Sequence, residues 1–448
     1  MAGIRRKKGM SHAQIMALGF IMVIMAGTFL LMLPIASKTG TSTHFFDCLF
    51  TSVSATCVTG LVVVDTFNHW TLFGQIVILV MIQIGGLGII TISAIVYSVF
   101  RRRIGLNMRN MIQESIYAFQ LDGITNTLKR IFRRTIIIEM IGAAILCSQF
   151  IPQLGVAKGI WYGIFHSISA FCNAGFDLMG RYGEYSSLTT VRDNPVILIT
   201  LMALIVIGGL GFVVWDDILD KKLKIRKYSL HSKVVLIMLG ALVAGGTILY
   251  LIFEHDNLFA GMNPGERLLS AIFASVTPRT AGFNTLDVEG MTQASKILTC
   301  ILMFIGGNSG STAGGIKTTT VIVMGAYIFS SLARTTGPRV LKRRIGDENI
   351  KTASMVFGLN LSILVTALLI ISCVQRMPLD DVLLEVFSAM GTVGLSAGIT
   401  RNLLPISKII LMIMMFSGRI GTVTFAVTFK SNKRKAFIKY PEERINVG

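Results

Sequence analysis

A short apolar motif that ends in glycine recurs four times and constrains the fold of this chain more than any other feature. The copies read L-F-T-S-V-S-A-T-C-V-T-G-L at 49–61, I-F-H-S-I-S-A-F-C-N-A-G-F at 164–176, I-F-A-S-V-T-P-R-T-A-G-F at 272–283 and V-F-S-A-M-G-T-V-G-L at 386–395. Their glycines, Gly60, Gly175, Gly282 and Gly394, are 115, 107 and 112 residues apart. Each apolar segment is too short to span a bilayer, which takes about 20 residues. Long internal repeats of this kind predict four equivalent units around one axis.

The composition places these units in a membrane. Of the 448 residues, 52% are hydrophobic and only 15% are charged, whereas soluble chains carry roughly 25% charged residues. The formal net charge is +19, but the Lys and Arg residues lie in short runs between apolar spans. This pattern is typical of a cytoplasmic membrane face, so we expect no nucleic-acid binding. The six cysteines lack metal-ligand spacing and are expected to be packing residues.

Each short copy lies between two apolar segments that are long enough to cross a bilayer. The sequence therefore predicts an all-α polytopic membrane protein with eight spans and four re-entrant loops around one pseudo-fourfold axis. The expected units are 1–103, 104–220, 221–333 and 334–429, followed by a basic tail at 430–448. Within the second unit, the charged segment 104–134 is predicted to lie at the cytoplasmic interface. Clustered Lys and Arg residues in the N-terminus, the inter-unit loops and the tail predict that both termini are cytoplasmic.

We call the ends of the four copies, T-C-V-T-G, C-N-A-G-F, R-T-A-G-F and G-T-V-G-L, the glycine loops. A non-helical backbone at membrane depth needs partners for its carbonyl groups, and a dehydrated cation can be that partner. Glycine permits the close approach and the unusual φ values that turn carbonyls inward. A single glycine loop can be an ordinary turn, but four copies in phase favour a filter. The expected filter residues are Thr59, Gly60, Ala174, Gly175, Ala281, Gly282, Val393 and Gly394.

Acidic residues flank the copies on both sides. Asp47, Glu266, Asp380 and Asp381 precede the short apolar segments, where a negative charge suits the N-terminus of a helix. Asp65, Asp177 and Asp287 follow the glycines and are expected to concentrate cations at an outer mouth. The fourth copy has Thr400 and Arg401 instead, so such a ring of acids is incomplete. Ordinary solvated loop acids remain an equal alternative for these aspartates.

The apolar segment 296–330 is interrupted by G-G-N-S-G-S-T-A-G-G at 306–315. These residues are poor helix formers and too polar for lipid, so we expect a broken span whose middle enters the cavity below the filter. A kinked helix beside a water-filled gap is the alternative. The segment also resembles a phosphate-binding loop, but Ile316 separates Gly315 from Lys317 and breaks the required spacing.

Similar glycine-rich interruptions occur at 84–88, 207–211 and 417–421, and close helix packing is the alternative explanation for the first two. The last interruption contains Arg419, and a charge inside a span is a functional hypothesis by default. We predict that Arg419 pairs with loop carbonyls or side chains and adds an electrostatic barrier to passing cations. Lys317 is expected to act similarly.

The four glycine loops and the stretch from Gly306 to Thr318 resemble the Trk/Ktr/HKT superfamily of potassium transporters, and most closely the membrane subunit of bacterial Ktr systems. The resemblance implies four M1–pore helix–M2 repeats around one potassium pathway, and Gly60 matches the potassium-selective members. It also implies that 306–315 is an intramembrane gating loop opposite the pore-facing Arg419. The implied gate residues are Gly306, Gly307, Asn308, Ser309, Gly310, Gly314, Gly315, Lys317 and Arg419.

The resemblance further implies a homodimer on a cytosolic ring of regulatory subunits that bind ATP, ADP or a dinucleotide. The chain itself is expected to need no cofactor, with K⁺, or also Na⁺, as the transported or activating ion. The basic loops suit either those subunits or anionic membrane lipids. We therefore expect potassium uptake across the plasma (inner) membrane, with the potassium ion held by the backbone carbonyls of a selectivity filter. A sodium-coupled symporter with alternating access is the alternative. An enzyme is not expected, because the spans lack a cluster of His, Asp or Cys residues.

Overall fold

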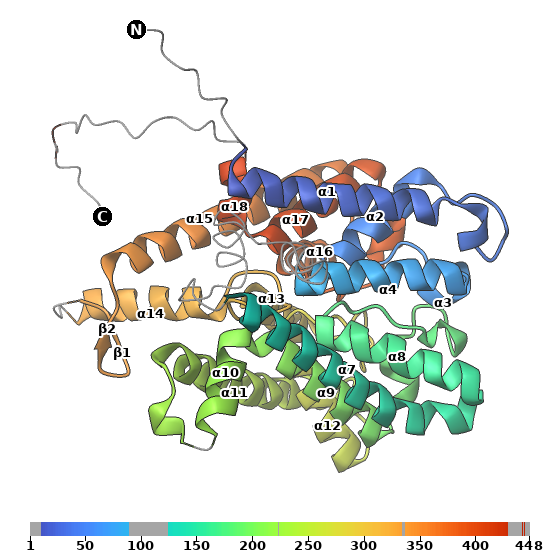
Figure 1. Ribbon diagram of the computed structural model, residues 1–448, viewed down its shortest axis with the longest axis horizontal. Coiled ribbons are helices and arrows are strands. Elements are labelled where there is room, and N and C mark those ends of the chain that lie inside the picture. The colour runs from blue at the N-terminus through green and yellow to red at the C-terminus, as the bar shows by residue number, and fades with distance from the viewer. Residues whose placement is uncertain are drawn as a thin grey trace, which may run out of the picture.

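The computed structural model describes residues 10–88, 124–222, 224–333 and 337–428, together with residues 441 and 443. Helices make up most of these residues, which confirms the predicted fold class (Figure 1). Within the described residues the only sheet is a two-stranded hairpin, with β1 at Arg339–Val340 and β2 at Arg343–Arg344.

The helices repeat one order four times: a long helix, a short half-span helix and a closing helix that is short or broken. The half-span helices are α2 (Phe45–Thr56), α8 (Val156–Cys172), α12 (Pro264–Val276) and α16 (Leu379–Gly391). The long opening helices are α1 (His12–Leu31), α7 (Ile124–Leu154), α11 (Leu230–Phe253) and α15 (Asp347–Val374). The closing helices are α4 (Leu72–Leu87), α9 (Pro195–Leu210) with α10 (Phe212–Lys221), α13 (Gln293–Phe304) with α14 (Thr318–Leu332), and α17 (Pro405–Ile420) with α18 (Thr422–Thr428). Short helical turns lie in the connections: η1 (Pro34–Ala36), α3 (Thr66–His69), η2 (Met179–Arg181), η3 (Ser187–Val191), η4 (Ile225–Lys227) and η5 (Ile399–Asn402).

Among the described residues, the four opening helices are long and apolar enough to cross a membrane. The pairs α9–α10 and α17–α18 each add a span bent by 100° and 107°, respectively. Large apolar side chains on the outward faces of the opening helices stay exposed, including Met22, Met140, Ile252 and Leu369. Such faces suit contact with lipid tails, which are as apolar as leucine.

Three of the closing helices, α4, α9 and α17, end at an equivalent glycine. Gly88, Gly211 and Gly421 have φ values of +85°, +94° and +94°, a left-handed region that glycine enters without steric cost. Close packing accompanies the first two breaks. A Cβ on Gly85 or Gly208 would lie 2.0 Å from the carbonyl oxygen of Thr56 or Phe171, at the end of the half-span helix of the same repeat. The glycine motifs at 84–88 and 207–211 therefore both end a helix and allow it to pack closely against the half-span helix.

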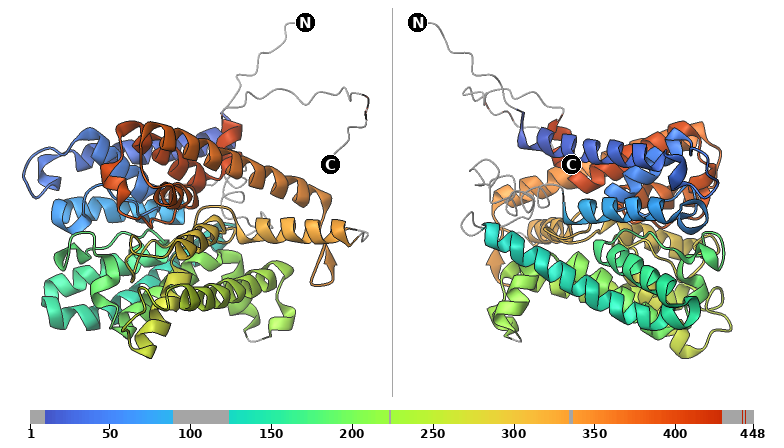
Figure 2. Two further views of the ribbon diagram at one scale, coloured as in Figure 1. Left: turned by 180° about the vertical axis from the view of Figure 1, so that it is seen from behind. Right: turned by 45° about the vertical axis from the view of Figure 1, so that its right-hand side comes forward.

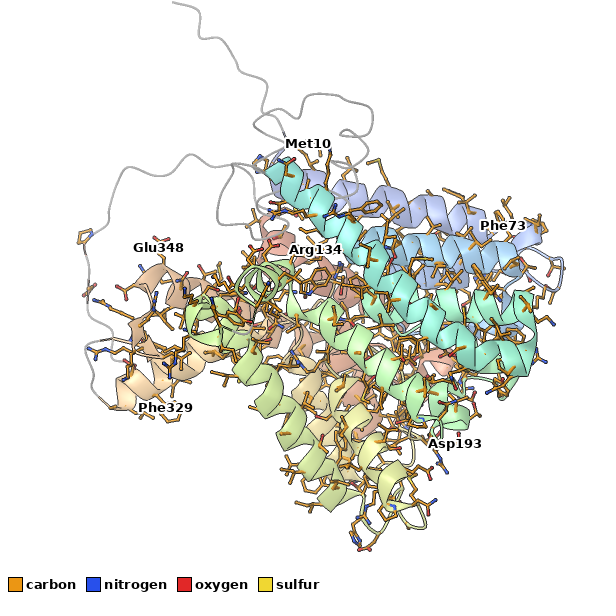
Figure 3. All side chains as sticks on the ribbon, turned by 60° about the horizontal axis from the view of Figure 1, so that its bottom comes forward. Met10, Phe73, Arg134, Asp193, Phe329 and Glu348 are labelled. Atoms are coloured by element: carbon orange, nitrogen blue, oxygen red, sulfur yellow. The ribbon has the colours of Figure 1, made fainter. Side chains whose placement is uncertain are left out.

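Helix α7 differs from the sequence prediction. It is one helix of 31 residues, so the charged residues 124–134 continue the opening helix and do not form a separate helix. Arg134 in this charged part of α7, labelled in Figure 3, forms an ion pair with Asp216 of α10. The rest of the predicted interfacial segment, 104–123, lies outside the described residues, as do 1–9 and most of the basic tail.

Polar contacts around the outer ends of the half-span helices join each repeat to the one before it. In three repeats an acid at the start of the half-span helix pairs with a base of the preceding repeat, and in the second repeat a tryptophan replaces the acid. The pairs are Lys408–Asp47 at 3.5 Å, Arg192–Glu266 at 2.9 Å, Lys296–Asp380 at 3.0 Å, Lys296–Asp381 at 2.8 Å and Trp161 Nε1 to Gln75 Oε1 at 2.8 Å. Because the fourth repeat contacts the first, the four units close into a ring.

The inner ends of the first and last repeats also meet. Helix α1 packs against α18, and the side chain of Gln14 donates to the carbonyl of Thr428 at 3.3 Å. Figure 2 shows the first and fourth repeats side by side, opposite the second and third. Helices α14 and α15 pack together and project from this body with the β1–β2 hairpin, near Phe329 and Glu348 in Figure 3.

Candidate functional site

The four glycine loops meet in a closed ring. A Cβ on Gly60 would lie 2.5 Å from the carbonyl oxygen of Ala174, and one on Gly175 would lie 2.8 Å from that of Ala281. The series continues with Gly282 at 2.2 Å from Val393 and Gly394 at 2.3 Å from Thr59. The φ values of the four glycines are +95°, +68°, +83° and +96°. The structure thus brings together all eight residues expected from the glycine loops, and both space and backbone conformation require glycine there.

Four further residues shape the ring, and sequence reasoning missed them. Val58, Asn173, Thr280 and Thr392 stand two positions before the glycines and have φ values of +56°, +58°, +74° and +51°. Left-handed conformations are outliers for β-branched residues and cluster at functional sites. In each glycine loop, one residue without a positive φ lies between two residues with a positive φ. Only asparagine carries a weak sequence signal for this conformation.

The amide groups of the glycine loops are bound to their own half-span helices. Thr59 and Ala174 each donate at 2.8 Å to the carbonyls of Ser54 and Ser169, and Ala281 and Val393 each donate at 2.9 Å to those of Thr277 and Ser388. Side-chain hydroxyls add a second bond in every repeat: Gly60 N to Ser54 Oγ at 3.1 Å, Gly394 N to Ser388 Oγ at 3.0 Å, Ser169 Oγ to Phe176 O at 2.7 Å and Thr277 Oγ1 to Phe283 O at 2.5 Å. None of the described residues donates a hydrogen bond to the carbonyls of Thr59, Ala174, Ala281 or Val393. These oxygens are therefore free to replace the water around an ion.

A cavity of about 170 Å³ opens on one side of the ring, lined by all four glycines and by Asp65, Asp177 and Asp287. The three acids also order the surrounding loops. Asp65 accepts from the amides of Asn68 at 2.7 Å and Tyr185 at 3.0 Å. Asp177 accepts from Met179 at 2.9 Å, and Asp287 accepts from Glu289 at 3.2 Å. Their position at the mouth is as expected, and each additionally caps a turn.

The pKa of Asp177 makes the charge of this cavity sensitive to pH. Burial raises the pKa of its carboxyl group to about 6, against the opposing effect of the Met179 amide. The negative charge is therefore present above pH 6 and is lost as the pH falls through this value. We expect the KM for rubidium uptake to rise about threefold between pH 7.5 and 5.5, because the mouth attracts cations less strongly. The Asp177→Asn variant should have the higher KM at both pH values. The exposed Asp193→Asn serves as the control, and an unaltered pH profile in Asp177→Asn would refute this role.

The 306–315 loop lies on the other side of the ring. Its ends are held together by a bridge between Ile305 and Ile316, and it separates α13 from α14. A Cβ on Gly314 would lie 2.1 Å from Oγ1 of Thr392, which is one of the left-handed residues of the ring. The interruption expected from the sequence is therefore present, and its loop packs directly against the fourth glycine loop.

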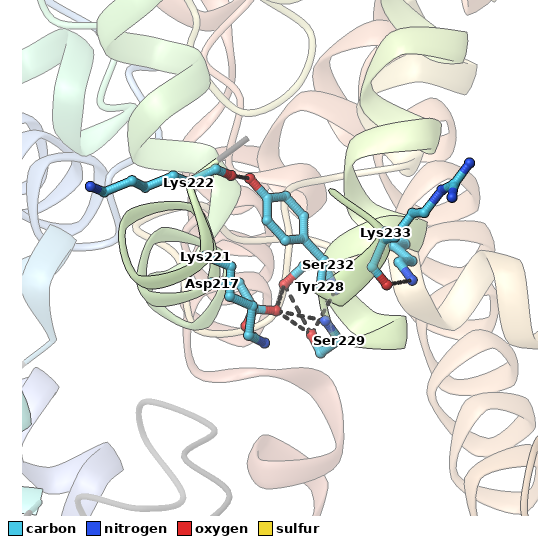
Figure 4. Close-up of polar contacts among 8 residues, drawn as sticks. Asp217, Lys221, Lys222, Tyr228, Ser229, Ser232 and Lys233 are labelled. Atoms are coloured by element: carbon cyan, nitrogen blue, oxygen red, sulfur yellow. Dashed lines mark hydrogen bonds and ion pairs between the residues drawn. The ribbon is translucent and has the colours of Figure 1, made fainter. Parts of the chain in front are cut away.

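The 306–315 loop is attached to the second repeat where α9 gives way to α10. Asn308 Nδ2 donates to the carbonyl of Gly209 at 2.8 Å, and Phe212 N donates to that of Gly310 at 2.8 Å. Thr312 Oγ1 donates to Phe171 O, at the end of α8, at 3.1 Å. Helix α10 is fixed in turn to α11, because Asp217 accepts from the hydroxyls of Ser229 and Ser232, both at 2.6 Å (Figure 4).

Arg419 joins the loop to the first repeat. Its guanidinium donates to the carbonyl oxygens of Thr312, Gly85 and Gly86, the last at 2.8 Å. Lys317 Nζ donates to Ala313 O at 2.8 Å. Both cations thus bind the carbonyls of loops and broken helices. An inner cavity of about 690 Å³ reaches both side chains, together with Gly310 of the loop.

The remaining expected gate residues shape the 306–315 loop itself. Gly310 and Gly315 have φ values of +69° and +66°. A Cβ on Gly306 would lie 2.7 Å from Gly314 O, and one on Gly307 would lie 2.2 Å from the Cβ of Ala313. Ser309 lines a second inner cavity of about 670 Å³, beside Gly315 and Lys317.

A multi-pass helical chain with four re-entrant loops around one ring of free carbonyls defines a membrane cation transporter, not an enzyme. The TrkH family of cation transport proteins matches residues 6–439, so the chain belongs to this family.

Similar proteins agree with this assignment. The potassium/sodium uptake protein NtpJ of Enterococcus hirae is 41% identical, over 99% of both chains. The Ktr system potassium uptake protein B of Bacillus subtilis is 37% identical, over 97% of this chain and 96% of its own length. The crystal structure of the potassium transporter TrkH from Vibrio parahaemolyticus has the same fold, with a TM-score of 0.74 at 18% identity, covering 96% of this chain and 87% of that one.

Proposed function

We propose that the protein takes up potassium, with the carbonyl oxygens of Thr59, Ala174, Ala281 and Val393 coordinating the dehydrated ion. The observation that carries this proposal is the closed ring of four glycine loops. Their amides are bound to the half-span helices, while the carbonyls of Thr59, Ala174, Ala281 and Val393 have no hydrogen-bond donor among the residues that the structure describes. Relatives named for potassium or potassium/sodium uptake support the choice of ion. The chain would need no cofactor of its own for this function.

The gate in this proposal is the 306–315 loop together with Arg419. The loop lies between the ring and the inner cavities, and hydrogen bonds hold it to the second repeat. Opening requires the loop to leave Thr392 and Arg419 to release Thr312. A loop of small residues can make this movement without leaving a large side chain in the pathway.

Cytosolic regulatory subunits that bind nucleotides would control this movement, with two copies of the chain forming a homodimer on their ring. Relatives named as components of Ktr systems support such a partner. The proposed orientation has both termini and the β1–β2 hairpin in the cytoplasm of a cell bounded by its plasma membrane. The basic residues Arg339, Lys342, Arg343 and Arg344 of this hairpin suit an acidic subunit surface or anionic lipid headgroups.

Growth and flux measurements test the proposed function. We expect the gene to restore growth of potassium-uptake-deficient bacteria at low external potassium. Purified protein in proteoliposomes should carry rubidium with or without sodium, because the proposed filter holds the ion by backbone carbonyls and needs no second ion. Rubidium flux in strict stoichiometry with sodium would instead support a sodium-coupled transporter with alternating access.

A further inference from the structure

Glu385 is a buried carboxylate outside the carbonyl ring. It lies in the half-span helix α16, is only 1% exposed, and its Oε1 accepts from the hydroxyl of Thr400. Its second oxygen, Oε2, has no hydrogen-bond partner among the described residues. No basic side chain in the described part of the chain forms a salt bridge with Glu385. Burying a polar oxygen without a partner is unfavourable, so this oxygen points to an additional ligand.

Two hydroxyl groups connect Glu385 to the outer cavity. Ser396 Oγ lies 3.0 Å from Thr400 Oγ1 and accepts from the amide of Gly398 at 3.0 Å. Ser396 and Thr400 both line the outer cavity of about 170 Å³, whereas Glu385 lies behind them. One carboxylate and two hydroxyl oxygens therefore form a connected cluster at the wall of this cavity, with only the hydroxyl-bearing residues in its lining.

The charge of the cavity favours a cation. Asp65, Asp177 and Asp287 line three of its sides, and Arg401 is the one basic residue in its lining. Arg401 is held at the cavity wall, because its guanidinium stacks 4.3 Å from the ring centre of Tyr185 and donates to Gly398 O at 3.3 Å, and it is outnumbered by the acids of the lining, which also include Glu289. The fourth repeat thus supplies its carboxylate from the half-span helix and not from the loop after the glycine.

A comparison with the second repeat indicates that Glu385 does more than hold its loop. His166 stands three residues before Ser169, as Glu385 stands three residues before Ser388. His166 is fully buried, and its Nε2 accepts from Leu178 N at 3.2 Å while Nδ1 contacts Tyr162 O at 2.7 Å. Both polar atoms of the histidine are occupied by its loop and helix. Glu385 binds its loop through Oε1 alone, which accepts from Thr400, and its Oε2 has no partner among the described residues.

We propose that Glu385, Ser396 and Thr400 form a second cation site for a small monovalent ion such as Na⁺, beside the pore axis. Carboxylate and hydroxyl oxygens are hard ligands that suit alkali and alkaline-earth cations. A single carboxylate balances one positive charge, and water from the outer cavity completes the coordination. The protein ligands of this site are all side-chain oxygens, so the site is chemically distinct from the carbonyl ring.

Binding of ²²Na⁺ to the purified full-length protein at pH 8.0, in potassium-free choline chloride, tests this site. We expect saturable binding by the wild type and at least about a tenfold loss of Na⁺ affinity in Glu385→Gln, because a charged ligand is removed. Thr400→Val should weaken binding as well and serves as the second variant if Glu385→Gln does not fold. The rubidium-dependent rise in Tm, which reports the carbonyl ring, should persist in both variants.

The filter variant Gly282→Ala separates this proposal from the proposed potassium pathway. It should lose the rubidium-dependent rise in Tm and keep ²²Na⁺ binding, so either site can fail without the other. Wild-type levels of ²²Na⁺ binding in both Glu385→Gln and Thr400→Val would overturn the proposal. Absence of ²²Na⁺ binding to the wild type at pH 8.0 would also overturn it, since a proton would then occupy Glu385.

Discussion

We expect the Gly282→Ala variant to lose rubidium uptake about a hundredfold, because its side chain disrupts the carbonyl ring. A Cβ at this position would lie 2.2 Å from the carbonyl oxygen of Val393. Contacts of a Cβ atom shorter than about 3.0 Å are essentially never observed in proteins. The φ of +83° adds strain, which costs roughly 1–2 kcal/mol for a residue with a side chain. Val393 is itself a ring residue, so the collision moves an ion ligand. Initial rates of ⁸⁶Rb⁺ uptake, normalised to the amount of protein in the membrane, measure the effect.

Gly40→Ala is the matched control for this strain. Gly40 has a φ of +70°, but nothing lies within 4 Å of an added Cβ. This variant carries the same backbone penalty without the collision and should retain most of its uptake. The other three ring glycines provide a series, because their distances to the next loop are 2.3 Å for Gly394, 2.5 Å for Gly60 and 2.8 Å for Gly175. We expect the loss of uptake to decrease in that order, and equal uptake by Gly282→Ala and Gly40→Ala would contradict the ring.

The Arg419→Gln variant should conduct more rubidium than the wild type in the absence of regulatory subunits, by about tenfold or more. A fixed positive charge about 8 Å from a passing ion raises its energy by about 2 kcal/mol at an effective dielectric constant of about 20. The variant also loses hydrogen bonds to Thr312, Gly85 and Gly86, which join the 306–315 loop to the first repeat. Both effects act in the same direction, and proteoliposome flux measures their sum.

Arg419→Lys distinguishes the two effects. Lysine keeps the charge but lacks the planar fork that reaches three carbonyls at once. A high flux in both variants assigns the closed state to the hydrogen bonds, whereas a high flux in Arg419→Gln alone assigns it to the charge. Arg226→Gln, at an exposed arginine of η4, controls for a general change in net charge. Unchanged flux and unchanged gating in Arg419→Gln would show that this arginine has no part in the gate.

Local sequence patterns were sufficient to predict the four-repeat architecture and the position of each break. The glycine motifs mark both the loops and the broken helices, because few other residues tolerate a left-handed backbone at a close contact. The same reasoning located the 306–315 loop, whose small polar residues suit neither lipid nor helix.

Other features depend on contacts between distant residues. Nothing local in the sequence shows that Val58, Thr280 and Thr392 are left-handed, since β-branched residues normally avoid this region. The acceptors of Arg419 in the first repeat lie more than three hundred positions away, with a separation of 333 residues to Gly86. The acids at the outer ends of the half-span helices were expected to act through the helix dipole, but they also form ion pairs with the preceding repeat. Such partners emerge only when the four repeats close.

Anomalous scattering from crystals grown in rubidium or thallium salts tests the carbonyl ring most directly. The account requires a peak on the axis, within coordination distance of the carbonyl oxygens of Thr59, Ala174, Ala281 and Val393, at a position that potassium can displace. Anomalous density that is absent from this axis and present elsewhere in the same crystals would contradict it.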